Sequence, residues 1–198
     1  PANLIAFAVP MLLELGVGFT LSFVIRLFLS IVQMGGEIID TQMGMTMAQI
    51  YDASTQANLT VTGSLLNILL ILDFFAENGH YTLLRVLVTS GEVLPYGTAS
   101  FGQSVASLVA ELFLTCMVLA VKLALPILAA ELLGEIGMGI LMKAIPQINA
   151  FVINMELKVI IGLGLFFLFL TPINEFLLSA EVQMLSSLGQ VLETIGGG

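Results

Sequence analysis

One proline and two amides, Pro146, Gln147 and Asn149, interrupt a mostly apolar stretch at residues 142–151. Lys158 follows shortly afterwards, directly before a further apolar run. In a helix facing lipid this pattern is costly, because proline removes a backbone donor while amide and ammonium groups need partners that hydrocarbon lacks. Such a break is tolerated where protein or a water-filled passage covers it, as in channels and transporters.

The composition points to the same environments. Of the 198 residues, 58% are hydrophobic and 10% are charged, whereas a soluble domain carries about 25% charged residues. We therefore predict an all-α fold of long apolar helical hairpins with broken helices, in a multi-span membrane protein or a subunit buried in a large assembly. The net charge of −9 argues against a nucleic-acid partner, which requires a basic face.

Long apolar regions divide the chain, and a helix takes about 20 residues to cross a bilayer. These regions are Leu4–Met34, Leu59–Ala76, Ser104–Leu133 and Val159–Leu170. Pro10 is the expected start of a helix that runs to about Met34, where Gly35-Gly36 ends or kinks it. After a turn at Glu77–His80, residues 81–94 are predicted to form a further helix.

The C-terminal region has helical periodicity. Its apolar residues recur every three or four positions, at Leu177, Ala180, Met184, Leu188, Val191 and Ile195. Polar residues, among them Glu181, fall mainly between them, which predicts an amphipathic helix for a surface or a partner. We expect residues 1–198 to form a single domain with this amphipathic helix and tail at 175–198.

A polar stripe crosses the third apolar region. Its members, spaced for one helical face, are Ser104, Ser107, Glu111, Thr115 and Lys122. Glu111 and Lys122 would lie roughly 16 Å apart along the helix, too far to pair with each other. Each therefore needs a partner from another helix or subunit. Two interpretations stay open, a structural ion pair inside a helix bundle and the lining of a passage.

No pattern in the sequence indicates an enzyme. His80 is the single histidine and Cys116 the single cysteine, which we expect to be a buried structural thiol. The sequence contains no nucleotide-binding loop and no Ser/His/Asp or Cys/His arrangement. We therefore predict no catalytic residue, no cofactor and no metal.

Small and flexible side chains suggest close packing or sealing. Glycines at 16 and 18, at 134, 137 and 139, and at 162 and 164 allow helices to approach closely. Methionines alternate at Met43, Met45 and Met47. They suit a deformable seal, because methionine adapts to irregular shapes, but ordinary core packing explains them equally well.

Five blocks, in order along the chain, resemble the FliR family, the R subunit of the export gate in bacterial flagellar and related type III secretion systems. The blocks are Glu14-x-Gly16-x-Gly18, Gly36-Glu37-Ile38-Ile39 with Gln42-Met43-Gly44, Asn78-Gly79-His80, Lys122-Leu123-Ala124-Leu125-Pro126 and Pro146-Gln147-x-Asn149-x-Phe151. Two departures are Ala53, where the family usually has proline soon after the aspartate, and Met155-Glu156 in place of a Phe-Pro pair. Family members also begin with an upstream apolar hairpin that this sequence lacks.

The resemblance implies a channel subunit at the bacterial cytoplasmic membrane, in the flagellar basal body. Such subunits assemble with FliP and FliQ, contact FlhB, and conduct unfolded export substrates. The segment around residues 51–58 aligns with the loop expected to plug the closed channel. The candidate gate residues are therefore Met43, Met45, Met47, Tyr51, Asp52, Ser54, Thr55, Gln56 and Asn58. The candidate inter-subunit contacts are Glu14, Glu37, Gln42, Glu111, Lys122, Pro146, Gln147, Asn149 and Lys158.

Two other interpretations stay open. The first is the equivalent subunit of a virulence injectisome, which exported cargo or neighbouring genes would distinguish. The second is a secondary transporter whose broken helices at Pro126 and Pro146 form a substrate site. It predicts saturable uptake of a small solute by the protein alone.

Overall fold

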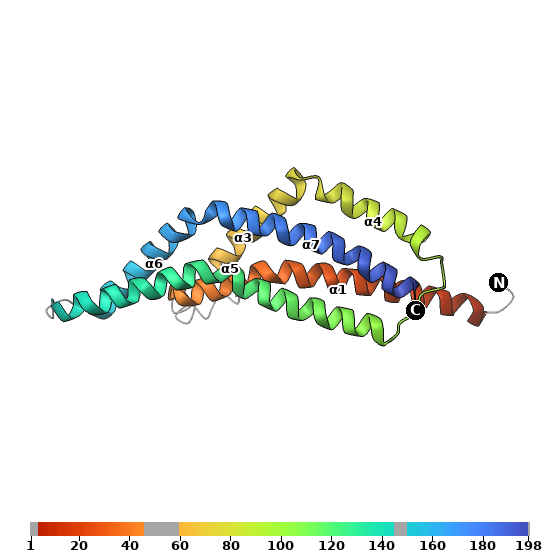
Figure 1. The fold of residues 1–198 in the computed structure, drawn as a ribbon, viewed down its shortest axis with the longest axis horizontal. Helices are drawn as coiled ribbons and strands as arrows, with labels where there is room; N and C mark the ends of the chain where they lie inside the picture. The colour runs from red at the N-terminus through yellow and green to blue at the C-terminus, as the bar shows by residue number, and fades with distance from the viewer. Residues whose placement is uncertain (1–3, 46–59, 145–149, 198) are drawn as a thin grey trace. The chain divides into compact units, whose positions relative to one another are not determined.

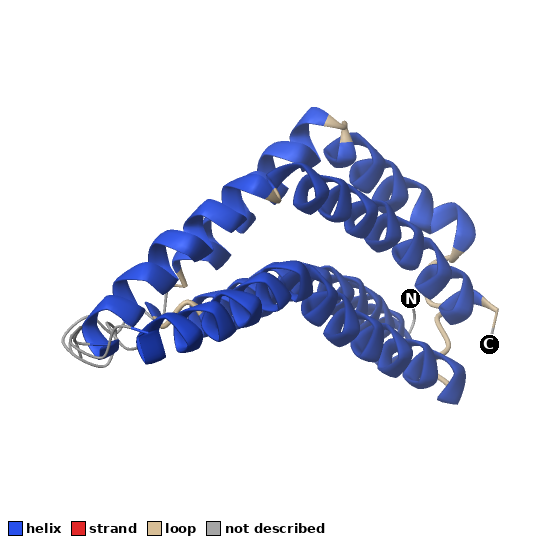
Figure 2. Ribbon diagram, turned by 60° about the vertical axis from the view of Figure 1, so that its left-hand side comes forward, coloured by secondary structure: helices blue, strands red, loops and turns tan. Residues whose placement is uncertain are grey.

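The computed structural model describes residues 4–45, 60–144 and 150–197, and in this part of the chain the protein consists of helices joined by turns and loops (Figures 1 and 2). The helices are α1 (Leu4–Gln42), α3 (Val61–Ala76), α4 (Gly79–Val93), α5 (Gln103–Ala144), α6 (Ala150–Leu168) and α7 (Leu170–Gly196). The all-α prediction is confirmed, and α3 and α4 follow the predicted ranges closely.

The start and end predicted for the first helix are wrong, and so is the break at Pro126 that the secondary-transporter interpretation requires. Helix α1 begins before Pro10 and continues through Gly35-Gly36 as far as Gln42. Helix α5 continues through Pro126 as one element of 42 residues. Glycine and proline weaken a helix locally, but tertiary packing overrides such preferences. At Gly35 that packing is visible, since an added Cβ would lie 2.8 Å from the Leu123 side chain.

Broken helices occur elsewhere. Helices α3 and α4 bend by 70° at a short break, and α6 and α7 bend by 62° at another. At the first break, Asn78 adopts a left-handed backbone conformation with φ 59°. Gly79 follows, where a Cβ would lie 2.6 Å from the Phe74 ring. The turn predicted at Glu77–His80 is therefore confirmed.

Contacts divide the chain into two compact units, and α1, α3, α5 and α7 each contribute residues to both. Unit 1 comprises Pro1–Ser30, Leu70–Val118 and Leu177–Gly198, and unit 2 comprises Ile31–Leu69 and Leu119–Phe176. The prediction of one domain over residues 1–198 stays a prediction. Each unit joins segments that are distant in sequence, so its core depends on long-range packing.

In unit 1, α7 buries the apolar face that its periodicity predicts. All six periodic residues are buried, the least of them to 7% exposure. Cys116 of α5 is buried in the same unit, as expected. Glu181 departs from the pattern, because its side chain is buried at 6% exposure rather than facing outward.

Two described helices are long and apolar enough to cross a membrane, Phe7–Gln42 and Gln103–Lys143. The number rises to four if each bent pair counts as one span. Large apolar side chains are exposed along both helices, among them Phe19 at 70% and Leu133 at 70%. A chain with such surfaces requires lipid or protein around it.

Candidate functional site

Helices α1 and α3 meet in unit 2 at a pair of glycines. A Cβ added at Gly36 would collide with the backbone of Gly63. Two backbones approach this closely only where neither residue carries a side chain. Gly36 opens the second of the five blocks found in the sequence, and its role here is helix packing.

Asp40, one turn after Gly36, fastens the same crossing. Its side chain is fully buried, and both carboxylate oxygens lie 3.2 Å from the Thr62 backbone nitrogen, which donates to them. The Thr62 hydroxyl donates to Asp40 as well. Thr62 lies in the first turn of α3, where backbone N–H groups have no partner within the helix and favour a negative charge.

Asp40 is not among the candidate residues predicted from the sequence. A signal was available, because Asp40 follows Gly36 by four residues and so shares its helix face. An acidic residue on the face that bears a close-packing glycine needs a donor from the neighbouring helix.

Three helices of unit 2 contribute to a polar contact around Glu135. Lys158 of α6 forms an ion pair with the Glu135 carboxylate of α5. Gln42 of α1 donates a long hydrogen bond of 3.5 Å from its side-chain amide to the same carboxylate. Two of the predicted inter-subunit residues, Gln42 and Lys158, therefore meet within this chain. Their contact with other subunits stays a prediction.

A second acid, Glu131, lies one turn before Glu135 and is 2% exposed. Its Oε1 atom has no hydrogen-bond partner in the described part of the chain. A Cβ at Gly162 would lie 2.7 Å from this oxygen and 2.5 Å from Cγ of Met43. Glu131, Met43 and Gly162 thus converge on one point in the core, where glycine leaves room for both side chains.

The candidate gate residues fall into two groups. Met43 is fully buried in unit 2, and Met45 is half-buried. The others, together with three of the candidate contacts, lie outside the described residues: Met47, Tyr51, Asp52, Ser54, Thr55, Gln56, Asn58, Pro146, Gln147 and Asn149. The sealing and plug assignments stay predictions.

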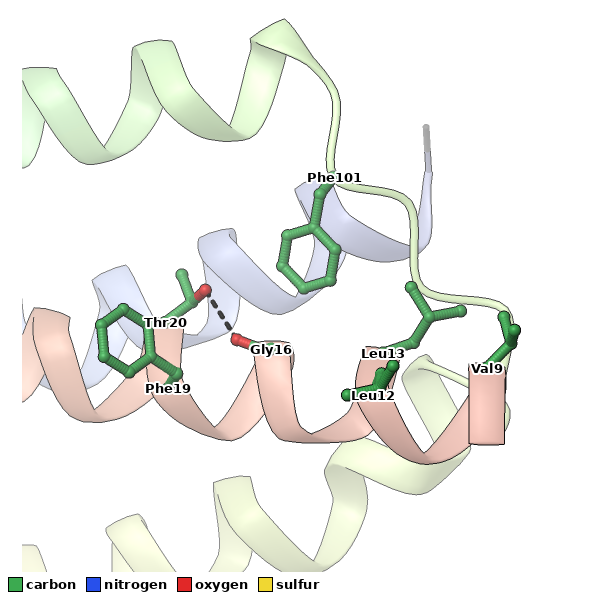
Figure 3. A pocket seen from close by; sticks show the side chains of 7 residues that line it. All are labelled: Val9, Leu12, Leu13, Gly16, Phe19, Thr20 and Phe101. Carbon is green, nitrogen blue, oxygen red and sulfur yellow. Dashed lines mark hydrogen bonds between the residues drawn. The ribbon is translucent and has the colours of Figure 1, made fainter. Parts of the chain in front are cut away.

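In unit 1, Glu14 holds the connection between α4 and α5 against α1. Its Oε1 atom accepts a hydrogen bond of 3.0 Å from the Gly97 backbone nitrogen. Gly97 has φ +81°, a conformation that favours glycine. Phe101, on the same connection, lies over Gly16, and both residues line a shallow apolar pocket (Figure 3). A Cβ added at Gly16 would lie 2.9 Å from the Phe101 ring. Glu14 and Gly16 of the first block therefore make contacts within this chain, and the predicted contact of Glu14 with another subunit stays a prediction.

Glu111 and Lys122 are exposed on α5, and Glu37 is exposed on α1. Among the described residues, none of the three side chains forms a hydrogen bond or an ion pair. The two charges on α5 lie within the apolar range Gln103–Lys143. They have the exposure that a contact with another subunit would use.

Other glycines that predicted close packing meet nothing in the described structure. A Cβ at Gly18, Gly134, Gly137, Gly139 or Gly164 would have no atom within 4 Å.

The described residues contain no group of three or more side chains able to hold a metal ion.

Comparison with known protein families shows which family this chain is related to. The family model described as "Bacterial export proteins, family 1" matches residues 1–183. This chain belongs to that family of bacterial export proteins. The resemblance to the FliR family, drawn from five short blocks, is thereby confirmed.

Individual export proteins are similar to the chain at 28–29% identity. "Flagellar biosynthetic protein FliR" of Bacillus subtilis is 28% identical, over 72% of this chain and 56% of its own length. The protein of the same name from Escherichia coli is 28% identical, over 71% and 54%. "Secretion system apparatus protein SsaT" of Salmonella typhimurium is 29% identical, over 74% and 57%. The chain spans about half the length of these relatives.

Proposed function

We propose that this member of the export family is a non-enzymatic channel subunit of the flagellar type III export gate. In this proposal it assembles with FliP-like and FliQ-like subunits, contacts a FlhB-like subunit, and conducts unfolded export substrates across the cytoplasmic membrane. The family match and the relatives named FliR support the proposal.

The observation that carries the assembly proposal is the pair of exposed charges on α5. Glu111 and Lys122 lie in the apolar part of α5, Gln103–Lys143, whose 41 residues are enough to cross a membrane. A charge facing the bilayer centre costs at least about 2.5–3.5 kcal/mol. A partner subunit that presents complementary polar groups offsets this cost, whereas lipid does not.

An injectisome subunit is the second candidate, favoured by the similarity to "Secretion system apparatus protein SsaT". Identities of 28% to the flagellar proteins and 29% to this one do not separate the two systems. Exported cargo separates them, since flagellar components would accumulate inside cells that lack the protein if the flagellar assignment is right.

Mass spectrometry of the detergent-solubilised complex tests the proposal. Two or three small membrane proteins of the export apparatus should co-purify with the complete protein from its own membrane. Liposomes that contain the protein alone should show no saturable solute uptake. A protein that purifies alone and transports a solute would replace the gate proposal with the secondary-transporter alternative.

A further inference from the structure

The contact of α5 with α6 in unit 2 holds two acids but one base. Helix α5 carries Glu131 and Glu135 one turn apart, and α6 carries Lys158 and Gly162 one turn apart. Lys158 faces Glu135, while Gly162 faces Glu131. Lys158 therefore pairs with Glu135, which is half-buried, whereas Glu131, which is fully buried, faces glycine.

Among the described residues, the charged groups that act on Glu131 are Lys158 of α6 and Glu135 of its own helix. Helix α1 contributes Met43, which is apolar, and Gln42, whose amide donates to Glu135. The nearby acid of α1, Asp40, is satisfied by Thr62. A buried carboxylate without a dedicated partner is strongly unfavourable, so this arrangement favours a bound proton.

We propose that Glu131 is a proton-binding site whose occupancy controls the contact between Met43 of α1 and Gly162 of α6. With the proton bound, Glu131 is neutral and packs against both residues. When the proton leaves to water, the carboxylate competes with Glu135 for Lys158. Four residues of helix separate the two acids by about 6 Å, a step that the flexible lysine stem can cover.

Release of the proton therefore loosens the core at Met43. Water or the Lys158 ammonium must approach Glu131, and the space beside Gly162 is occupied by the Met43 side chain. Movement of Met43 changes the C-terminal end of α1, since Met43 directly follows Gln42. Protonation of Glu131 and its packing against Met43 do not depend on the proposed channel function.

Infrared difference spectroscopy on the complete protein in lipid vesicles tests the bound proton directly. At neutral pH the unaltered protein should show a protonated-carboxyl band that disappears as the pH is raised. Glu181 is a second buried acid with an unpartnered oxygen, so the comparison is made in a Glu181→Gln background. There Glu131→Gln should remove the band that remains, whereas the exposed control Glu37→Gln should keep it. An identical band in the Glu131→Gln protein would overturn the assignment.

Thiol labelling tests the coupling to Met43. The reporter is Met43→Cys in a Cys116→Ala background, labelled with maleimide in native membranes. Thiolate formation itself accelerates labelling with pH, so each rate is divided by the rate for the same reporter with Glu131→Gln. This ratio should rise by up to about tenfold per pH unit while the carboxyl ionises. A ratio that stays constant with pH would overturn the coupling.

Lys158→Met provides a second variant, because it removes the cation that an ionised Glu131 recruits. The rise in the labelling ratio should then shift to higher pH. No shift would contradict the proposed exchange of Lys158 between the two acids.

Discussion

Both carboxylate oxygens of Asp40 lie 3.2 Å from the backbone nitrogen of Thr62, so α1 caps the first turn of α3. The bond joins residues that are 22 positions apart, and the Gly36–Gly63 contact brings the two helices close enough to form it. Backbone packing and a buried charge therefore depend on each other at this crossing.

Asp40→Ala should lower the free energy of unfolding by about 2 kcal/mol, because the Thr62 amide and hydroxyl lose their acceptor in a buried position. Thermal unfolding of the purified protein, followed by circular dichroism, measures this change. Glu37→Ala alters an exposed acid on the same helix and should stay within about 0.5 kcal/mol. Equal effects from the two variants would contradict the capping role.

Gly36→Ala should destabilise the protein by about 1–3 kcal/mol, since the new methyl group meets the Gly63 backbone and α1 must move away from α3. Gly18→Ala is the matched control on the same helix, where a Cβ has no neighbour within 4 Å. The control should raise stability by about 0.5–1 kcal/mol, because alanine favours helices over glycine. The same unfolding assay should give opposite signs for the two variants.

Lys158→Met should lower stability by about 1 kcal/mol, because Glu135 loses its cation while its side chain stays partly solvated. Comparison with Glu135→Gln and with the double variant isolates the pair. We expect a coupling free energy of about 0.5–1 kcal/mol from this cycle. Strictly additive effects would show that the ion pair contributes nothing to stability.

Lys122→Leu should weaken assembly with partner subunits, because Glu111 or a neighbouring acidic group loses its compensating charge. Native gels of solubilised membranes should show at least a severalfold lower yield of the complex, as expected for a loss of about 1 kcal/mol or more. Lys122→Arg retains the charge and should assemble normally. Unchanged yield with leucine would argue against a partner-facing charge at this exposed position.

Deletion of residues 52–58 tests the plug assignment, which rests on the family resemblance. If these residues close the channel, the deletion should raise the ion conductance of the membrane while export persists. Replacing the same residues with Gly and Ser at equal length separates the chemistry of the segment from its bulk. A conductance equal to that of the unaltered protein would remove the assignment.

Helix content and helix faces were predictable where the pattern is local. The α7 face was predicted in full, because apolar residues at intervals of three and four mark one side of a helix. The continuity of α1 through Gly35-Gly36 and of α5 through Pro126 was not predicted, because glycine and proline weaken a helix only locally. Contacts from other helices outweigh that weakness, and these come from parts of the chain distant in sequence.

The sequence by itself determined the helical class, the apolar surfaces and the membership in the export family, because composition, periodicity and short blocks are local properties. Only the tertiary structure decided that Asp40 caps α3, that Gln42 and Lys158 meet at Glu135, and that Glu131 is buried beside Met43. Periodicity shows which side of a helix is buried, but the partner it meets depends on packing between distant segments. Met43, Glu135, Lys158 and Gly162 surround Glu131 only when α1, α5 and α6 are in contact.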